Sequence, residues 1–507
     1  MLPEIFISLL LIVSSLVTTV YLMWRRKVSY WKVRGVPSAT PELPYGNIKD
    51  LLFMRKTLGQ HYDQIYWQFK NEPFCGIYQL WKPALLIRDP EMLKTVFVKE
   101  FSSFHDNHYF VNPEVEPILG LNPFNTKGDN WWKARKILTP SVTPVKIKTM
   151  IPQMYDVCKE MIQYLQNTDE EYIEAHDMMG KYSTDIVGSC AYGIQSNSFK
   201  DANSVLRQVS KSMFDGTYRG NIALLCALYA PKLGNIFRYK ILTDEASEYF
   251  VGFVRATYKY RVENKVQRND YLQSLINANE EAIAQNQMPI YNDVELAAHC
   301  MTFFLDGFET TAILLSFIAY ELSLNEDVQN TLRDAIKEKG EKLEDFDFDT
   351  VHDIEYLHML VMEGLRKHPP GTTMARTCTK STLLKSGEKE VEVEEGVPVV
   401  LPMYSIHNDP QYFPNPDRFD PLRFTEENKN KRPMFAHFPF GGGPRTCPGQ
   451  KFALTMIKLG IISLVLNFKI LPKEYNSRGK VIYDPMNTFF HTALNGLWMK
   501  YVPLMKN

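Results

Sequence analysis

The longest uninterrupted apolar run in the chain lies at its N-terminus. Ile5–Trp24 spans twenty residues without a charge, and a helix of that length measures about 30 Å, enough to cross the hydrocarbon core of a bilayer. Glu4 precedes the run and basic residues 25–27 follow it, whereas a cleaved signal peptide carries its positive charge before the apolar run. We therefore predict a membrane anchor over residues 1–27, with the rest of the chain on the cytosolic side.

A proline-rich segment follows the anchor. Pro37, Pro41 and Pro44 lie within residues 28–49, and proline fixes φ and cannot continue a helix, so we expect a stiff, extended hinge. Beyond it, residues 50–507 contain no low-complexity linker and no repeat. The sequence thus predicts one large domain joined by a hinge to a single anchor.

Within this domain the apolar spacing is mainly helical. The clearest helical stretches are 152–166, 245–263 and 293–323, and the strand-like ones are 74–87 and 389–400. Pro152 suits the first turn of its helix, where proline costs no intrahelical bond. At 389–400 a Glu395-Gly396 turn separates two apolar runs, which predicts a hairpin. The fold class expected is mainly α with a small β-rich lobe (α+β).

The apolar segment 296–322 raises the alternative of a second membrane span. It carries Asp306, Glu309 and Glu321, and acids at the centre of a span are costly. A long helix through the core of the domain is the better interpretation. Acids at its centre then need a function, because an unpaired buried carboxylate is also costly.

Charge and cysteine content narrow the class of protein. The 57 Lys and Arg residues balance 58 Asp and Glu residues, for a formal net charge of −1, which argues against nucleic acid as a partner. The seven cysteines include no C-x-x-C pair, so neither a disulfide scaffold nor a zinc site is indicated.

One cysteine lies in an unusual local sequence. Residues 440–449 read Phe-Gly-Gly-Gly-Pro-Arg-Thr-Cys-Pro-Gly, just before a helical pattern that begins near Gln450. Glycines permit a tight turn, and prolines stiffen it. We expect Cys447 to be presented on a rigid loop, where backbone N–H groups and the helix N-terminus favour its thiolate, a ligand suited to a soft metal centre. A buried structural cysteine is the alternative for this residue considered alone.

The loop matches a known motif. Phe440, Gly443, Arg445, Cys447 and Gly449 fit F-x-x-G-x-R-x-C-x-G, so the sequence resembles the cytochromes P-450. The resemblance implies the cytochrome P-450 fold and a haem b cofactor, with Cys447 as the ligand of its iron.

Further motifs extend the resemblance along the chain. Glu363 and Arg366 match the E-x-x-R pair of the family, and Pro421–Phe424 matches the P-x-R-F element whose arginine joins that pair in a structural role. Trp131 and Arg135 match W-x-x-x-R.

A haem group brings two carboxylate propionates that must be neutralised when they are buried, and arginine suits carboxylates. The resemblance therefore assigns cofactor contacts to Trp131, Arg135, Arg376, Phe440, Arg445 and Cys447.

The central helix carries the motif associated with oxygen activation. Gly307, Glu309, Thr310 and Thr311 fit A/G-G-x-D/E-T-T/S, which implies that Glu309 and Thr310 are catalytic and relay protons. Asp306 departs from the pattern, which has a small residue there. Three roles remain open for it: an added relay acid, a handle for a basic group of the substrate, or, slightly favoured, an acid turned aside into a hydrogen bond.

The resemblance is to microsomal forms, most closely insect ones related to the vertebrate drug-metabolising group. It implies an endoplasmic-reticulum monooxygenase that inserts one oxygen atom of O2 into a lipophilic xenobiotic, hormone or lipid. Electrons would come from NADPH through NADPH-cytochrome reductase, docked near Lys133, Lys136 and Lys451, with cytochrome b5 as a second candidate donor. A haem-thiolate isomerase or dehydratase that needs no O2, and a non-enzymatic haem sensor, are the alternatives.

Overall fold

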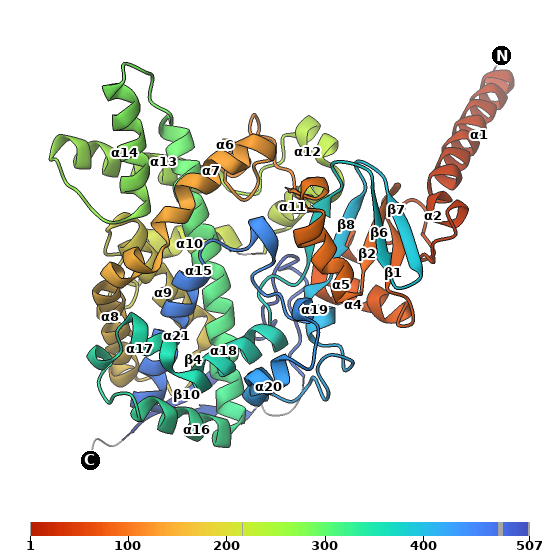
Figure 1. Ribbon diagram of the computed structural model, residues 1–507. Helices are drawn as coiled ribbons and strands as arrows, with labels where there is room; N and C mark the ends of the chain where they lie inside the picture. Colours follow the sequence, from red (N-terminus) through yellow and green to blue (C-terminus); the bar gives the residue numbers. More distant parts are fainter. Residues whose placement is uncertain (1, 215, 475–479, 505–507) are drawn as a thin grey trace.

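Helices form most of the computed structural model, which describes residues 2–214, 216–474 and 480–504 (Figure 1). The predicted domain therefore includes segments, 475–479 and 505–507, that lie outside the described residues. Strands β1, β2, β6, β7 and β8 gather on one side, beside the base of the N-terminal helix. The predicted class, mainly α with a small β-rich lobe, is confirmed.

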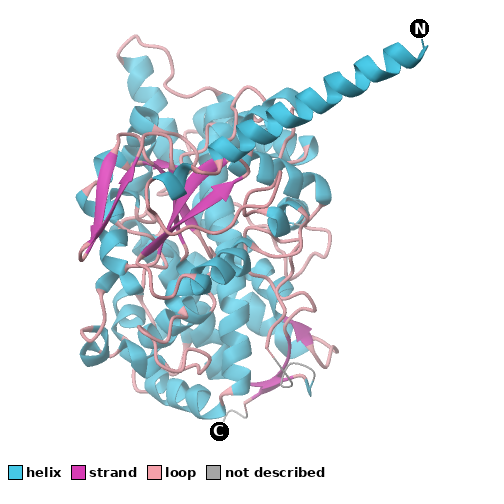
Figure 2. Ribbon diagram, turned by 90° about the vertical axis from the view of Figure 1, so that its right-hand side faces the viewer, coloured by secondary structure: helices cyan, strands magenta, loops and turns pink. Residues whose placement is uncertain are grey.

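The N-terminal helix α1 (Leu2–Lys27) projects away from the rest of the molecule (Figures 1 and 2). Its segment Ile5–Lys27 has a mean hydropathy of 2.4, and none of this apolar stretch is buried inside the protein. The following turn of helix, α2 (Tyr30–Val33), is fixed by Trp31, whose side chain is fully buried and whose Nε1 donates to the Ile77 carbonyl at 3.1 Å. The exposed apolar helix thus ends shortly before Trp31, a residue that is anchored in the core.

The largest sheet joins segments that are far apart in the sequence. Its order is β1-β2-β8-β5-β3, and only β2 and β8 run parallel. Its strands are β1 (Phe74–Gln79), β2 (Lys82–Ile87), β8 (Pro398–Leu401), β5 (Met374–Thr377) and β3 (Asp106–Asn107). Two smaller sheets are β4 (Ile173–Glu174) with β10 (Trp498–Pro503) and β9 (Phe468–Pro472), and β6 (Thr382–Ser386) with β7 (Lys389–Val393). In Figure 2 the sheet that contains β10 lies near the C-terminus, far from the main sheet.

The predicted hairpin over 389–400 is wrong. The turn exists, with Gly396 at φ 86°, but β7 pairs with β6, whereas β8 pairs with β2 and β5. Burial explains the difference, because all four residues of β8 are buried while β7 alternates. A wholly apolar strand is stabilised more in the interior of a sheet than on one side of a half-exposed hairpin.

The remaining α-helices include the long central α15 and form the bulk of the molecule (Figure 1). They are α3 (Lys49–Leu52), α4 (Leu58–Gln68), α5 (Pro90–Lys94), α6 (Pro117–Gly120), α7 (Gly128–Ser141), α8 (Pro144–Asn167), α9 (Ala175–Val187), α10 (Val205–Phe214), α11 (Tyr218–Tyr229), α12 (Pro231–Phe237), α13 (Asp244–Glu263), α14 (Tyr271–Ala284), α15 (Asp293–Leu324), α16 (Glu326–Lys337), α17 (Phe348–Asp353), α18 (Glu355–Lys367), α19 (Met403–His407), α20 (Glu426–Lys429) and α21 (Gln450–Asn467).

The helix predicted to begin at Pro152 starts earlier than expected. Pro144 occupies the first turn of α8, and Pro152 lies inside the helix with its ring exposed. The buried face continues upstream through Ile147, Met150 and Ile151, so packing extends the helix past the proline despite the lost hydrogen bond.

The long helix predicted over 293–323 is confirmed as α15. Asn292 caps it by accepting hydrogen bonds from the Val294 and Glu295 amides, and the Glu295 side chain accepts in return from the Asn292 amide. Although α15 is long and apolar enough to span a membrane, 78% of its most apolar window is buried inside the protein. It is therefore a core helix, and its acids Glu309 and Glu321 are buried.

Candidate active site

The loop before α21 is shaped by glycine. Gly443 has φ 66°, and a Cβ there would lie 1.8 Å from the Phe97 carbonyl oxygen, so no other residue fits. The loop closes on itself because the Cys447 amide donates to the Phe440 carbonyl at 2.9 Å, and the Thr446 hydroxyl donates to the same oxygen at 3.2 Å. Cys447 is half-buried at the end of this turn. Phe440, itself half-buried, packs on the main core.

The protein alone does not favour the Cys447 thiolate, contrary to the sequence-based expectation. Burial, reinforced by the charge of Asp306, raises the pKa of this thiol to about 11, against the opposing effects of the Gly449 backbone amide and of Arg135. The electrostatics of the loop are therefore weaker than the desolvation of the sulfur. A coordinated cation deprotonates a thiol outright, so the thiolate form depends on a metal ion.

Arg376, on β5, is buried without a hydrogen-bond partner. Only 2% of its surface is exposed, and its guanidinium makes no hydrogen bond within the described residues. Burial, followed by repulsion from Arg445, lowers its pKa to about 9. A buried guanidinium in this state needs an anionic ligand.

Arg445 lies between the sheet and α7. Its guanidinium carbon lies 4.2 Å from the centre of the buried Trp131 ring, its Nη2 donates to the Thr126 carbonyl at 3.0 Å, and its Nε is buried without a partner. Burial lowers the pKa of Arg445 to about 10. Its nearest anion is Asp106, 3.6 Å from Nη2.

Arg135 completes the cationic group around the cysteine. Its Nη2 donates to the Thr446 carbonyl at 2.7 Å, and its charge influences both Cys447 and Arg445. The structure thus brings together the predicted residues of α7, β5 and the cysteine loop. Sequence reasoning missed Asp106, which also accepts from the Gly128 amide at 3.0 Å; it lies in a two-residue strand that no periodicity marks.

The predicted relay residues of α15 are not joined to each other. The Thr310 hydroxyl donates to the Asp306 carbonyl at 2.5 Å, while the Glu309 carboxylate, 2% exposed, lies 3.1 Å from Nε2 of His176 on α9. No hydrogen bond links Glu309 to Thr310 in the described part of the chain. Glu309 and His176 instead line a polar cavity of about 260 Å³, together with Arg207. No local pattern pointed to His176.

The surroundings of Asp306 contradict the role favoured from sequence, an acid turned aside into a hydrogen bond. Its carboxylate makes no hydrogen bond among the described residues, so it is not turned aside into one. Burial alone raises its pKa to about 7. By contrast, Glu321, further along α15, accepts from His368 at 2.6 Å and Lys367 at 2.8 Å.

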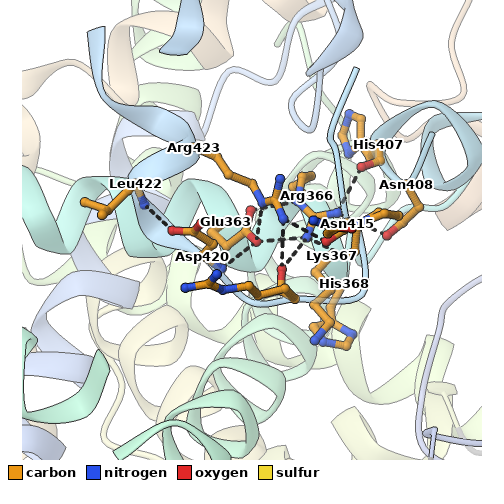
Figure 3. A network of polar contacts seen from close by, with 12 residues as sticks. Glu363, Arg366, Lys367, His368, His407, Asn408, Asn415, Asp420, Leu422 and Arg423 are labelled. Carbon is orange, nitrogen blue, oxygen red and sulfur yellow. Dashed lines mark hydrogen bonds and ion pairs between the residues drawn. The ribbon is translucent and has the colours of Figure 1, made fainter. Parts of the chain in front are cut away.

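A separate network of buried charges joins α18 to the segment that precedes the cysteine loop (Figure 3). Arg366 and Glu363 are both fully buried and make two hydrogen bonds, at 2.7 and 2.8 Å. Arg423 approaches Glu363 to 3.4 Å, and the Asp420 amide donates to the same carboxylate at 2.9 Å. The third member expected from the P-x-R-F motif is therefore present.

Comparison with known proteins assigns this arrangement to a family. The family described as Cytochrome P450 matches residues 40–488. Cytochrome P450 6k1 of Blattella germanica is 32% identical over 93% of this chain and 94% of its own length. Probable cytochrome P450 6a13 of Drosophila melanogaster is 32% identical over 97% and 99%, and cytochrome P450 9e2 of Blattella germanica is 30% identical over 96% of each.

The chain belongs to the cytochrome P450 family and is a monooxygenase. The family implies a haem cofactor, and the residues present fit one. Cys447 offers a soft thiol ligand, and the nearby arginines have fewer anionic partners in the protein than their charges need. Cys447 would hold the iron, and Arg135, Arg376 and Arg445 would neutralise the propionates.

Proposed function

We propose that the chain is an endoplasmic-reticulum monooxygenase that oxidises lipophilic foreign compounds, with electrons from NADPH delivered by NADPH-cytochrome reductase. The observation that carries the proposal is the conjunction of Cys447 on its rigid loop with the incompletely partnered Arg376 and Arg445. The similarity to insect cytochromes P450 over nearly the whole chain supports the substrate class. The exposed apolar surface of α1 supports anchoring, with the catalytic domain in the cytosol.

Haem, when bound, supplies the activation of O2, and the protein supplies position and protons. Glu309 holds a proton-accepting carboxylate at the wall of the polar cavity, where His176 can pass it a proton. Thr310 holds its hydroxyl on the next position of α15. Because Glu309 and Thr310 are not in contact, proton transfer between them requires rotation of the Glu309 side chain or an intervening water.

Electron donors need a cationic surface near Cys447. Lys133 and Lys136 on α7 and Lys451 on α21 are exposed, and acidic partners dock on such surfaces by electrostatic steering. We assign this face to the reductase and, as a second donor, to cytochrome b5. Charge reversal of all three lysines should slow reductase-supported turnover and weaken its salt dependence; unchanged values of both would remove the assignment.

The test of the proposed function is NADPH consumption by purified protein with reductase and O2 in the presence of lipophilic compounds. Substrate-stimulated oxidation of NADPH, with one oxygen atom from labelled O2 in the product, is the expected result. Rearrangement of a peroxide without O2 would identify an isomerase instead. Ligand binding without any turnover would identify a haem sensor.

A further inference from the structure

Asp306 is a charged side chain of α15 that the proposed chemistry does not use. The two acids that follow it on the helix are satisfied, Glu309 by His176 and Glu321 by His368 and Lys367. Asp306 makes no hydrogen bond or ion pair among the described residues. Its backbone carbonyl accepts from Thr310, which leaves the carboxylate itself free.

The carboxylate faces an internal space. Asp306 is accessible to a water-sized probe, although its neighbours Phe304 and Phe308 are 0% and 1% exposed. Surrounding protein nevertheless raises its pKa to about 7. A side chain that is deep in the protein and still accessible must line a cavity rather than the outer surface.

Cys447 lies near enough to Asp306 for the charge of one group to influence the other. The charge of Asp306 raises the pKa of the Cys447 thiol, which places the two groups within electrostatic reach of each other from α15 and from the cysteine loop. The cysteine side of the site is taken by the metal ligand. Asp306 lies one helical turn before Thr310, whose hydroxyl donates to its carbonyl, so a substrate bound at Thr310 would be within reach of the Asp306 carboxylate.

No cation among the described residues lies within ion-pair distance of the Asp306 carboxylate. His176, Lys367 and His368 contact the other buried acids of α15, Glu309 and Glu321, instead. Arg135 acts on Cys447 and Arg445, and Arg445 acts on Arg376. Because a buried charge without a partner is costly, its complement must come from a ligand.

We propose that Asp306 selects lipophilic substrates that carry an ammonium group, by pairing its carboxylate with that cation. The inference rests on the proposed function, since it names the class of substrate for the same site. A carboxylate without its own partner gains a charge-assisted contact with a cation and gains nothing from a neutral hydrocarbon.

A matched pair of probes isolates the charge. Benzyltrimethylammonium and neopentylbenzene have the same shape and differ by the positive nitrogen, and the quaternary nitrogen can neither bind iron nor lose a proton. Binding of each to the haem-loaded full chain is measured by equilibrium dialysis against a chamber without protein. Wild type should favour the cation by about tenfold or more, and Asp306→Asn should abolish this preference while leaving neopentylbenzene affinity unchanged.

Two further variants make the result decisive. Asp306→Ala installs a small residue of the kind that the family motif carries at this position, so it should fold and should also lose the preference. Asp349→Asn removes a carboxylate that is 70% exposed, at the start of α17, and should retain the preference. A wild-type ratio near or below one, or an unchanged ratio in both Asp306 variants, would overturn the proposal.

Failure of the proposed function would be distinguishable. Wild-type oxidation of neopentylbenzene with NADPH, reductase and O2 tests the reaction without the cation. Cation selectivity that depends on Asp306, combined with no oxidation of either probe, would contradict monooxygenation of this substrate class and leave the binding role supported. Oxidation of neopentylbenzene without cation selectivity would overturn the role of Asp306 alone.

Discussion

The charged pair Glu363 and Arg366 on α18 and the single charge of Asp306 on α15 are in opposite states. Glu363 and Arg366 on α18 satisfy each other and are closed off by Arg423 and by backbone groups (Figure 3). Among the described residues Asp306 on α15 has no such partner, and the Arg376 guanidinium makes no hydrogen bond either. The contrast indicates that satisfied charges hold this fold together, whereas unsatisfied ones mark where a ligand belongs.

The largest effect is expected where the charges are satisfied. Glu363→Ala leaves Arg366 and Arg423 buried without their carboxylate, which should lower the free energy of unfolding by about 3–5 kcal/mol. Urea denaturation measures this change in the free energy of unfolding. Asp349→Ala breaks the exposed pair with Lys148 and should cost only about 0–1 kcal/mol. Equal losses of stability in the two variants would show that the Glu363 network stabilises the fold no more than an exposed ion pair does.

Arg376 should behave in the opposite way, as a ligand-binding charge. Arg376→Met replaces an unpartnered cation with an apolar side chain, so haem should dissociate about ten- to a hundredfold faster, the loss of one charged hydrogen bond. Transfer of haem to an excess of a scavenging globin measures the rate.

The control for Arg376 is Arg333, a buried arginine of α16 that donates to the Val465 and Phe468 carbonyls. Arg333→Met should lower the urea midpoint and leave haem dissociation unchanged. If Arg376→Met lowered stability as much and released haem no faster, Arg376 would belong with the structural charges.

His176 tests whether the paired acid Glu309 of α15 contributes to stability and to proton transfer. Burial lowers its pKa, but the charge and hydrogen bond of Glu309 outweigh this, so the pKa is raised above its ordinary value of 6.5. The stability that the pair adds is therefore present below about pH 6.5 and is lost as pH rises through the raised value. His176→Gln should remove this dependence of the urea midpoint on pH. It should also lower product per NADPH, since Glu309 loses its neighbour at the cavity; a variant with the wild-type pH profile and yield would separate His176 from the relay.

Thr310→Ala should have the smallest effect on the protein and a selective one on chemistry. The variant loses the hydroxyl that donates to the Asp306 carbonyl without disturbing a buried charge. NADPH consumption should continue while hydrogen peroxide rises at the expense of product. Product yield at the wild-type level would show that the proton path bypasses Thr310.

Sequence reasoning reached the parts of the site that follow one another along the chain. Cys447 and its glycines, or Glu363 and Arg366, lie within one loop or one helical turn, and their spacing alone brings them together. His176 and Asp106 reach the site through contacts between distant segments, His176 being 133 residues from Glu309. No periodicity specifies such contacts.

Burial accounts for the other differences. Strand β8 pairs inside the main sheet because all its residues are buried, and the Cys447 thiol is neutral in the protein alone because desolvation outweighs the loop's N–H groups. Both depend on what surrounds a residue in space, which a one-dimensional pattern does not contain. The favoured role of Asp306 was wrong for the same reason.

The assignment of Cys447 as the metal ligand of a haem-thiolate site predicts the spectrum of the reduced, CO-bound protein. Wild type should show the Soret band of a thiolate-ligated haem. Cys447→His, with haem still bound, should lose that band and show the position typical of an imidazole ligand. Retention of the thiolate band in Cys447→His would contradict the account.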